Sequence, residues 1–328
     1  MIKDYKYIAL WLLSSLLITA CSKDGADGND VTKPNEQTKE IRFNADVWKM
    51  AEATRATTYD NAEALQAQGS FTCYAYTANS TTLNNDADIK GIPVTWNSTL
   101  NQWKFEISHH WPASGDLDFF AYMPATPQGY ISDISYTTAR NPQITCTNLP
   151  MTYNSESPEA GQGSGLQEFI YAMVTDQNKA GQGESGVELT FAHPFARIKL
   201  KLSSTQANIH INTITFKDLK KSGTCSFDGT TSSWTPTGDA TNFVVTLNAD
   251  CTANDVLGTD YIMIPQTWSG VIEVNAIWTD WDESVAHTVS VTLPELQRTW
   301  APGTNYTYTF TITETDLIVN TSKYTEQW

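Results

Sequence analysis

The feature that most constrains the fold of this chain is a series of short segments in which apolar and polar residues alternate. Residues 41–47 read Ile-Arg-Phe-Asn-Ala-Asp-Val, the period-2 pattern of a strand with one buried face. Clusters of Gly, Pro, Asn, Asp and Ser lie between such segments and predict turns. We expect further strands at residues 70–76, 103–107, 118–123, 170–174, 187–191, 197–202, 209–216, 242–247, 260–264, 271–278, 287–293 and 305–313.

Helical patterns are scarce, and the one convincing candidate is short, at residues 61–67. Many short strands without long helices between them indicate an all-β protein made of β-sandwiches, and 328 residues suffice for two domains. The polar, glycine-rich stretch 175–186 is the best boundary, which predicts domains at 40–180 and 187–328. A G-x-G-x-x-G match ends at Gly186, but a strand pattern follows where a dinucleotide-binding loop needs a helix, so we interpret it as a plain loop.

Residues 1–20 have the organisation of a secretory signal peptide. Lys3 and Lys6 precede an apolar run, residues 8–18, which is too short to cross a bilayer as a helix. The run ends in Leu-Ile-Thr-Ala before Cys21, the pattern of a bacterial lipobox, in which the cysteine is acylated and becomes the new N-terminus. Several acyl chains suffice for stable anchoring, because each buried methylene contributes about 0.8 kcal/mol.

The segment after the lipobox and the overall charge exclude some partners. Residues 21–39 are small and polar, which predicts a flexible tether. The Asp residues of this tether are spaced as in a calcium-binding loop, but the Glu that should close such a loop is missing. The formal net charge is −16, and no stretch gathers Lys and Arg into a patch. Because an acidic chain repels phosphate backbones, we expect no nucleic-acid partner.

Four cysteines follow Cys21, at positions 73, 146, 225 and 251. An exported chain permits disulfides, and four cysteines allow three pairings. Cys225 and Cys251 are the nearest to each other in sequence and form the best candidate pair, while free buried thiols remain the alternative. The spacings include no CxxC, so neither zinc nor thioredoxin-like chemistry is indicated.

The sequence contains no recognisable catalytic constellation. It has neither a GxSxG nucleophile elbow nor an HExxH pair. His109 and His110 are adjacent, and neighbouring strand residues point to opposite faces, so the two cannot chelate one metal ion together. We expect His193 to be structural, with a backbone partner. We therefore predict a non-enzymatic protein with no cofactor and no metal site.

Aromatic residues raise the question of sugar binding. Eleven Trp and fourteen Tyr could build a platform on which sugar rings stack, but β-sandwich cores use these residues routinely. Core packing is therefore the expected role of each one. Trp268, Trp278 and Trp281 are the strongest candidates for an exception.

Passages along the whole chain from Cys21 to Trp328 together carry a family resemblance. They are the lipobox, a first strand followed by Thr54-Arg55-Ala56, Trp-Pro at 111–112 leading to Asp-Phe-Phe-Ala-Tyr-Met-Pro at 118–124, Phe-Ala-His-Pro-Phe-Ala-Arg-Ile at 191–198, Met-Ile-Pro-Gln at 263–266 and Trp-x-Pro-Gly-x-x-Tyr-x-Tyr-x-Phe at 300–310. In this order the chain resembles the fimbrillin-like surface lipoproteins of Bacteroidota, which include the type V pilins.

The resemblance implies two tandem transthyretin-like β-sandwich domains and an assembly route. In polymerising members a trypsin-like protease cleaves after an arginine, the first strand leaves, and a C-terminal strand of a neighbouring subunit fills the groove. Here residues 41–47 would be the removable strand, Arg55 and Ala56 would flank the cleaved bond, and residues 313–328 would be the donor. A first strand that stays in place, in a tip, anchor or solitary adhesin, is the alternative.

We therefore expect a structural or adhesive subunit of surface fimbriae, anchored in the outer membrane through the lipid on Cys21. Its partners would be other fimbrial subunits and a host or bacterial surface ligand. The alternative function is a glycan-binding surface lipoprotein that serves nutrient uptake. A clustered, exposed set of Trp side chains would favour the alternative, and a labile first strand with an accessible Arg55 would favour the fimbrial subunit.

Overall fold

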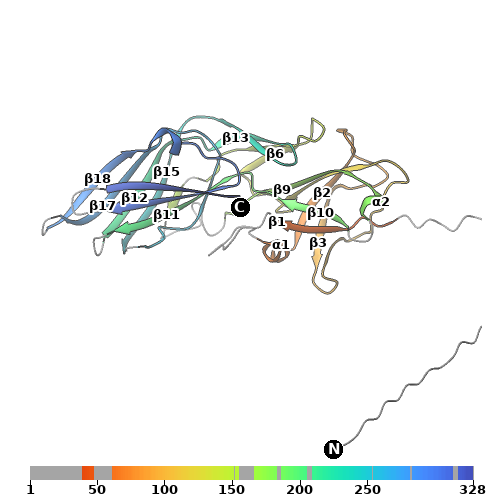
Figure 1. The fold of residues 1–328 in the computed structure, drawn as a ribbon, viewed down its shortest axis with the longest axis horizontal. Helices are drawn as coiled ribbons and strands as arrows, with labels where there is room; N and C mark the ends of the chain where they lie inside the picture. Colours follow the sequence, from red (N-terminus) through yellow and green to blue (C-terminus); the bar gives the residue numbers. More distant parts are fainter. Residues whose placement is uncertain are drawn as a thin grey trace, which may run out of the picture. The chain divides into compact units, whose positions relative to one another are not determined.

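A computed structural model of the chain shows an almost entirely β-stranded protein (Figure 1), as the alternating pattern predicts. The structure describes residues 39–47, 61–150, 152–154, 166–182, 186–204, 209–252, 254–280, 283–312 and 317–327. Cys21, Arg55 and Ala56 lie outside these ranges, as do the expected signal peptide and all but the last residue of the tether. Among the described residues, no helix has the length and apolar character needed to cross a membrane.

Seven strands form an N-terminal sheet in the order β10-β1-β4-β3-β2-β5-β9. They are β1 (Phe43–Val47), β2 (Ser70–Thr77), β3 (Lys90–Asn97), β4 (Gln102–Phe105), β5 (Leu117–Met123), β9 (Ile170–Gln177) and β10 (Val187–Phe191). The two outer strands meet, because Tyr171 in β9 and Ala192 just after β10 exchange backbone hydrogen bonds of 3.1 and 2.7 Å. The sheet therefore curls back on itself around an apolar interior.

Helix α1 (Ala62–Gln68) joins the segment after β1 to β2. The Asn61 side chain accepts a 2.8 Å hydrogen bond from the Ala64 amide, which caps the first turn. Gly69 ends the helix with a φ of +83°, a left-handed conformation that costs glycine little. Leu65 is fully buried in the same apolar interior as β1, so α1 covers that side of the N-terminal sheet.

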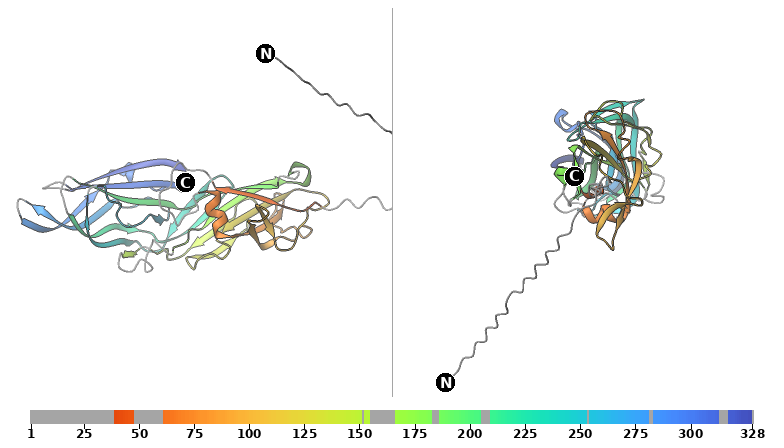
Figure 2. Two further views of the ribbon diagram at one scale, coloured as in Figure 1. Left: turned by 90° about the horizontal axis from the view of Figure 1, so that it is seen from below. Right: turned by 90° about the vertical axis from the view of Figure 1, so that its right-hand side faces the viewer.

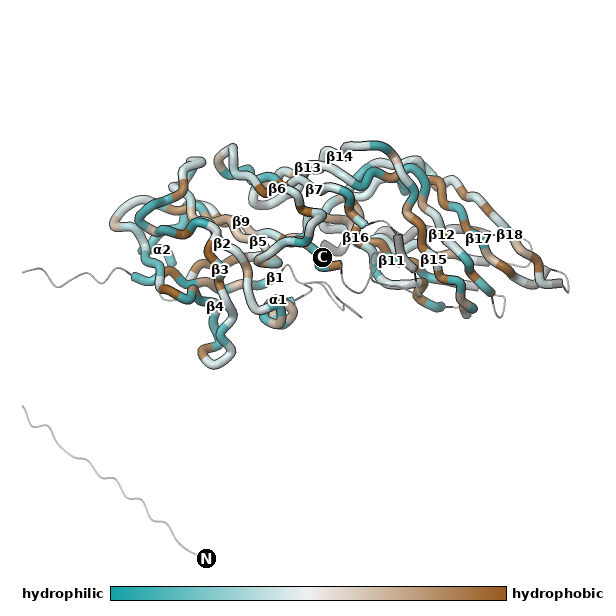
Figure 3. The backbone as a smooth tube through the Cα atoms, turned by 180° about the vertical axis from the view of Figure 1, so that it is seen from behind, coloured by the Kyte–Doolittle hydropathy of each residue, from teal (hydrophilic) through white to brown (hydrophobic). Residues whose placement is uncertain are grey.

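Nine strands form a C-terminal sandwich of two sheets. One sheet has the order β16-β11-β19-β20, and the other has the order β18-β17-β12-β15-β8. The strands are β8 (Thr152–Asn154), β11 (Ala196–Ser204), β12 (Ile209–Leu219), β15 (Thr241–Cys251), β16 (Tyr261–Met263), β17 (Val271–Asp280), β18 (Glu283–Thr292), β19 (Thr304–Ile312) and β20 (Leu317–Gln327). Brown and teal segments alternate along β12, β15 and β17 in Figure 3, as expected of strands with one buried face.

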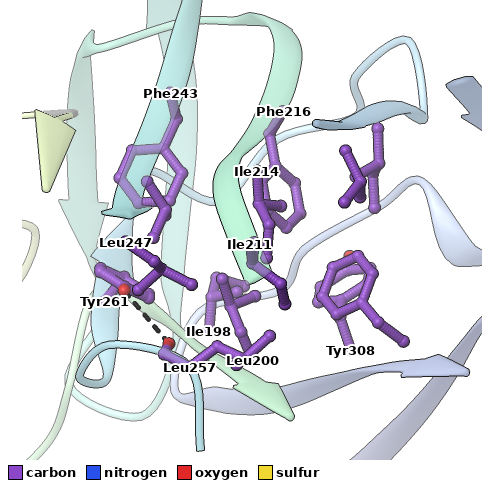
Figure 4. Packing of buried hydrophobic residues seen from close by; sticks show 14 of the residues in the cluster. Ile198, Leu200, Ile211, Ile214, Phe216, Phe243, Leu247, Leu257, Tyr261 and Tyr308 are labelled. Atoms are coloured by element: carbon purple, nitrogen blue, oxygen red, sulfur yellow. Dashed lines mark hydrogen bonds between the residues drawn. The ribbon is translucent and has the colours of Figure 1, made fainter. Parts of the chain in front are cut away.

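The C-terminal core packs side chains of both sheets against one another (Figure 4). Ile198 and Leu200 of β11 face Ile211 and Phe216 of β12, and all four are fully buried. The Tyr261 hydroxyl donates to the Leu257 carbonyl oxygen at 3.3 Å, so this buried phenol keeps a hydrogen-bond partner. Each buried large apolar side chain contributes about 1.5–3 kcal/mol, and the core therefore supplies most of the stability of the sandwich.

A third group of strands, which we call the bridging sheet, combines both halves of the sequence in the order β14-β13-β7-β6. Its strands are β6 (Ile131–Ser135), β7 (Gln143–Cys146), β13 (Ser222–Phe227) and β14 (Ser232–Thr237). Its inner face packs on aromatic side chains of the N-terminal sheet, as in the stacking of Phe227 on Tyr171 with ring centroids 3.7 Å apart. None of these four strands was among the segments expected from the alternating pattern.

The sheets cross the expected boundary between residues 180 and 187. Strand β10, which we expected to open the second domain, pairs in parallel with β1 in the N-terminal sheet. Strand β8 pairs with β15, and β7 pairs with β13. The expected loop 175–186 also contains a short helix, α2 (Lys179–Gln182). Division into two separately folding domains at 40–180 and 187–328 thus stays a prediction, and so does their transthyretin-like topology.

The four described cysteines are free, buried thiols, so the expected Cys225–Cys251 disulfide is not formed. Cys225 lies in the bridging sheet beneath its aromatic cluster, whereas Cys251 ends β15 in the C-terminal core. The two side chains therefore sit in separate apolar clusters. Burial raises the pKa of the Cys251 thiol to about 11 and that of Cys146 to about 12, which suppresses the reactive thiolate.

We predict that these thiols resist alkylation in the folded protein. In a chain that begins at Ser22, iodoacetamide at pH 8 should label none of the four natively and all four in urea without reductant. Mass spectrometry of the labelled protein measures the count. Two thiols missing from the denatured, unreduced sample would reveal a disulfide and contradict the buried-thiol arrangement.

Candidate functional site

The described residues with the clearest functional geometry are those around β1, the first strand. β1 lies inside the N-terminal sheet, between β10 and β4, although it comes first in the sequence. It runs parallel to β10, with Phe43 opposite Val187 and Val47 opposite Phe191, and antiparallel to β4. Figures 1 and 2 show the orange-red β1 beside the green β10. Removing β1 would leave the facing edges of two strands without a backbone partner.

The chain just before β1 is pinned by a second set of backbone hydrogen bonds. The Ile41 amide donates to the His109 carbonyl oxygen at 2.8 Å, and the Trp111 amide donates to the Lys39 carbonyl oxygen at 2.9 Å. The Val187 amide donates to the Arg42 carbonyl oxygen at 2.7 Å. The bound segment therefore extends over residues 39–47, and the His109–His110 pair holds it through the main chain. No cluster of potential metal ligands occurs in the part of the chain that the structure describes.

One face of β1 is apolar and fully buried. Ile41, Phe43 and Val47 are each 1–2% exposed. The Phe43 ring packs edge-to-face with rings from β2, β4 and β5, with centroid distances of 5.9 Å to Phe71, 5.6 Å to Phe105 and 5.4 Å to Phe119. Three such side chains contribute about 1.5–3 kcal/mol apiece, a total comparable with the net stability of about 5–15 kcal/mol of a whole protein.

The other face of β1 is polar and held by surface contacts. The Asn44 side-chain amide donates to a Glu188 carboxylate oxygen at 2.8 Å. Glu40 accepts a 2.6 Å hydrogen bond from the Ser108 hydroxyl and pairs with Arg42 at 3.1 Å. The Ser108 hydrogen bond lowers the pKa of the Glu40 carboxyl below its ordinary value, with Arg42 acting in the same direction. These contacts orient β1 within the N-terminal sheet, whereas burial of its apolar face supplies most of the free energy that holds it there.

The C-terminal strand β20 occupies an edge of the C-terminal sandwich. It pairs antiparallel with β19, from Ile312 opposite Leu317 to Thr304 opposite Gln327. Among the described strands, no other pairs with it. An edge strand can detach by breaking one ladder of hydrogen bonds, whereas an interior strand must break two. The expected donor segment, 313–328, thus contains a strand of eleven residues at an edge position.

The other side chains singled out from the sequence are structural. His193 is buried, and its ring nitrogen lies 3.1 Å from the Glu168 carboxylate, while the expected backbone partner stays a prediction. Trp268 and Trp278 are 5% and 2% exposed in the C-terminal core, and Trp281 lies outside the described residues. Trp268 and Trp278 therefore offer no exposed ring face on which a sugar could stack.

The arrangement can be compared with known proteins. A family model described as fimbrillin-like matches residues 54–328. The fold is similar to a crystal structure of a fimbrial protein from Bacteroides vulgatus, with a TM-score of 0.59 and 16% identity over 87% of this chain and 98% of that one. It is also similar to a candidate cell adhesion protein from Bacteroides ovatus, with a TM-score of 0.53 and 17% identity over 88% and 97% of the two chains. No curated protein matches the chain.

We predict that β1 is an essential part of the folded N-terminal sheet. Phe43→Ala should lower the free energy of unfolding by about 3–5 kcal/mol, because it leaves a cavity among three aromatic rings. Asn44→Ala, one residue away on the polar face, should cost only about 0.5–1.5 kcal/mol. Urea titration of both variants checks the difference. Equal costs for the two would mean that the apolar face of β1 is not packed as described.

Proposed function

Because the chain belongs to the fimbrillin-like family, we propose that it is a cell-surface fimbrial subunit that assembles by strand exchange. The fimbrial role follows from the family, and the exchange is the finer part of the proposal. The observation that carries it is the interior position of β1, between β10 and β4. The covalent connection from β1 to the other strands runs through residues 48–60 alone. One cut in that connection would separate β1 covalently from its sheet.

Cleavage after Arg55, with Ala56 as the new N-terminus, is the proposed trigger. Arg55 lies within residues 48–60 in the polar sequence Glu-Ala-Thr-Arg-Ala-Thr-Thr, which suits a trypsin-like protease. We call the position between β10 and β4 that β1 occupies the β1 slot. Before cleavage, the tethered β1 has a high effective concentration at this slot and excludes strands of other subunits. After cleavage, β1 binds as a separate segment and can be replaced.

The proposed replacement is β20 of a neighbouring subunit. Its eleven residues exceed the nine of the pinned segment 39–47, so it is long enough to fill the slot. Its Leu317 and Val319 are two residues apart, as Ile41 and Phe43 are, so in a strand they point to one face and match those two pockets. An incoming strand would restore the hydrogen bonds to β10 and β4 at a net gain of about 0.5–1.5 kcal/mol each.

The proposal places the protein at the cell surface, with Cys21 as the lipid anchor before processing. Residues 1–20 would be removed as a signal peptide, and residues 21–39 would link the lipid to the strands. The partners are other fimbrial subunits, and no catalytic residue is assigned. A stalk subunit needs both the cleavage and the donor strand, whereas a tip or anchor subunit uses one of them, and the two roles are separated by the experiment below.

We predict that cleavage after Arg55 converts a monomer into oligomers. Mild trypsin treatment of a chain beginning at Ser22 should cut at this bond and produce species of increasing mass, measured by size-exclusion chromatography with light scattering. The physical reason is that the freed slot accepts the β20 segment of another copy. Lys49 lies in the same connection and is also a trypsin site, so both chains carry Lys49→Gln. The Arg55→Gln variant of this chain is the matched control and should stay monomeric under the same protease.

A deletion of residues 314–328 tests the donor separately. The cleaved deletion variant should remain monomeric, and a synthetic peptide of residues 314–328 should bind it and raise its melting temperature. A cleaved chain with an intact tail that stays monomeric at high concentration would contradict assembly by strand exchange. A tip or solitary adhesin would then be the better assignment.

We also predict that Cys21→Ala releases the protein from the membrane or blocks its processing. Metabolic labelling with a palmitate analogue should mark the wild type and not the variant, because the thiol is the site of acylation. Cell fractionation provides the second readout. Recovery of the variant in the outer membrane at the wild-type level would contradict lipid anchoring.

A further inference from the structure

An open pocket at the edge of the bridging sheet lies apart from β1 and β20. It has a volume of about 600 Å³, within the range of about 300–1,000 Å³ typical of small-molecule sites. It is lined by Gln128, Gly129, Tyr130, Ser132, Thr147, Asn148, Pro150 and Leu166. These residues come from the segments on either side of the β6–β7 hairpin and from the start of the segment that leads into β9.

The walls of the pocket are built before any ligand arrives. The Tyr130 hydroxyl donates to the Gln167 carbonyl oxygen at 2.7 Å, and the Gln167 amide donates to the Gln128 side-chain oxygen at 3.0 Å. The Thr147 amide donates to the Tyr130 carbonyl oxygen at 2.7 Å. These bonds tie the two ends of the lining together, so a ligand would not have to order them.

The polar groups of the pocket match hydroxyl groups. Ser132 donates its hydroxyl to the Thr145 carbonyl oxygen at 3.2 Å and lies 2.8 Å from the Thr147 hydroxyl. With the Ser132 proton so engaged, Thr147 donates to Ser132 and keeps its own oxygen as an acceptor. The exposed Asn148 side chain adds an amide, which both donates and accepts. Pro150 and Leu166 add apolar surface of the kind that the C–H face of a sugar ring contacts.

The charge of the surroundings selects the ligand class. All eight lining residues are uncharged, in a chain with a net charge of −16. The four strands of the bridging sheet contain one charged residue, Asp133. Their outer face continues from the pocket as rows of hydroxyls and amides, and the tube of β13 and β14 is pale in Figure 3. The rows are Thr145, Thr224 and Thr235, and Gln143, Ser226 and Ser233.

From these observations we infer that the pocket binds a neutral oligosaccharide, whose chain extends over the outer face of the bridging sheet. A neutral sugar needs no ion pair, and its hydroxyls can both donate and accept. Anionic sugars would gain no counter-charge from the uncharged lining residues. This site goes beyond the proposed assembly, because neither the β1 slot nor β20 contributes to it.

The test uses the full-length chain in a detergent without a sugar headgroup. The probes are the neutral oligosaccharides maltohexaose, xylohexaose, mannohexaose and lacto-N-tetraose, and the anionic 3′-sialyllactose and trigalacturonic acid. Saturation-transfer NMR and calorimetric titration measure binding. We expect saturable binding of at least one neutral probe and none of the anionic ones. Failure of every neutral probe, or equal binding of an anionic one, would overturn the inference.

Two pocket variants and one control assign the binding to this place. Gly129 faces open space, where an added Cβ meets no heavy atom within 4 Å, so Gly129→Trp should fold normally and obstruct the pocket. Asn148→Asp keeps a residue that tolerates the observed φ of +54° but replaces the amide donor with a negative charge. Both should weaken binding by about tenfold or more. Gly181→Trp, at another exposed glycine, should bind as the wild type does.

Wild-type affinity in both pocket variants, with unchanged circular dichroism, would show that the sugar binds elsewhere and overturn the assignment. Assembly after cleavage at Arg55 gives an independent readout. The pocket variants should form the same oligomers as the wild type, so a failure of sugar binding is distinguishable from a failure of strand exchange.

Discussion

The placement of β1 between β10 and β4 is the constraint on which the N-terminal sheet depends. β1 is the first strand of the N-terminal sheet in the sequence, and β10 is the last. In the sheet, β1 lies between β10 and the hairpin of β3 and β4 and joins the two. Without β1, the backbone pairing of β10 among the described residues would be reduced to the bridge between Ala192 and Tyr171 of β9. The interior would also lose Phe43, on which Phe71, Phe105 and Phe119 converge. A strand in this position must be present or replaced, because an exposed apolar trench with unpaired backbone groups is unstable in water.

The bridging sheet makes the two halves of the chain mechanically dependent. Its inner face covers a hydrophobic cluster that includes Phe120 and Tyr171 of the N-terminal sheet and Ile264 near the C-terminal sandwich. The loop between β10 and β11 is fixed to it as well, since the Trp234 indole donates to the Pro194 carbonyl oxygen at 2.5 Å. The bridging sheet and the loop between β10 and β11 therefore tie the N-terminal sheet to the rest of the fold.

Sequence patterns predicted the strands whose one face is buried and whose residues alternate strictly. β10, with the sequence Val-Glu-Leu-Thr-Phe, is buried at every second residue, as expected. The pattern failed for β13 and β14, because their Ser, Thr, Gly and Pro residues indicate turns, and only pairing with β7 and packing of Cys225 and Phe227 make them strands. β3 was missed for a related reason, since it contains Gly91 and Pro93. The segment 41–47 was recognised as a strand, but its pairing with β10 and β4 could not be predicted, because these partners are distant in sequence. The contact between Ile41 and His109 could not be predicted either, because it is made by main-chain atoms and does not depend on the type of side chain. The pocket residues form no motif.

The energetics of exchange follow from how differently β1 and β20 are held. In the exchange proposed above, β20 would break one ladder with β19 and β1 would break two with β10 and β4, while the inserted copy would form two, so backbone hydrogen bonds alone do not favour insertion. While the connection through Arg55 is intact, the tethered β1 competes at an effective concentration in the millimolar range, far above that of free subunits. In the proposed assembly, the covalent link and the contacts of β1 together keep the precursor monomeric, and cutting the link removes the first of these two constraints.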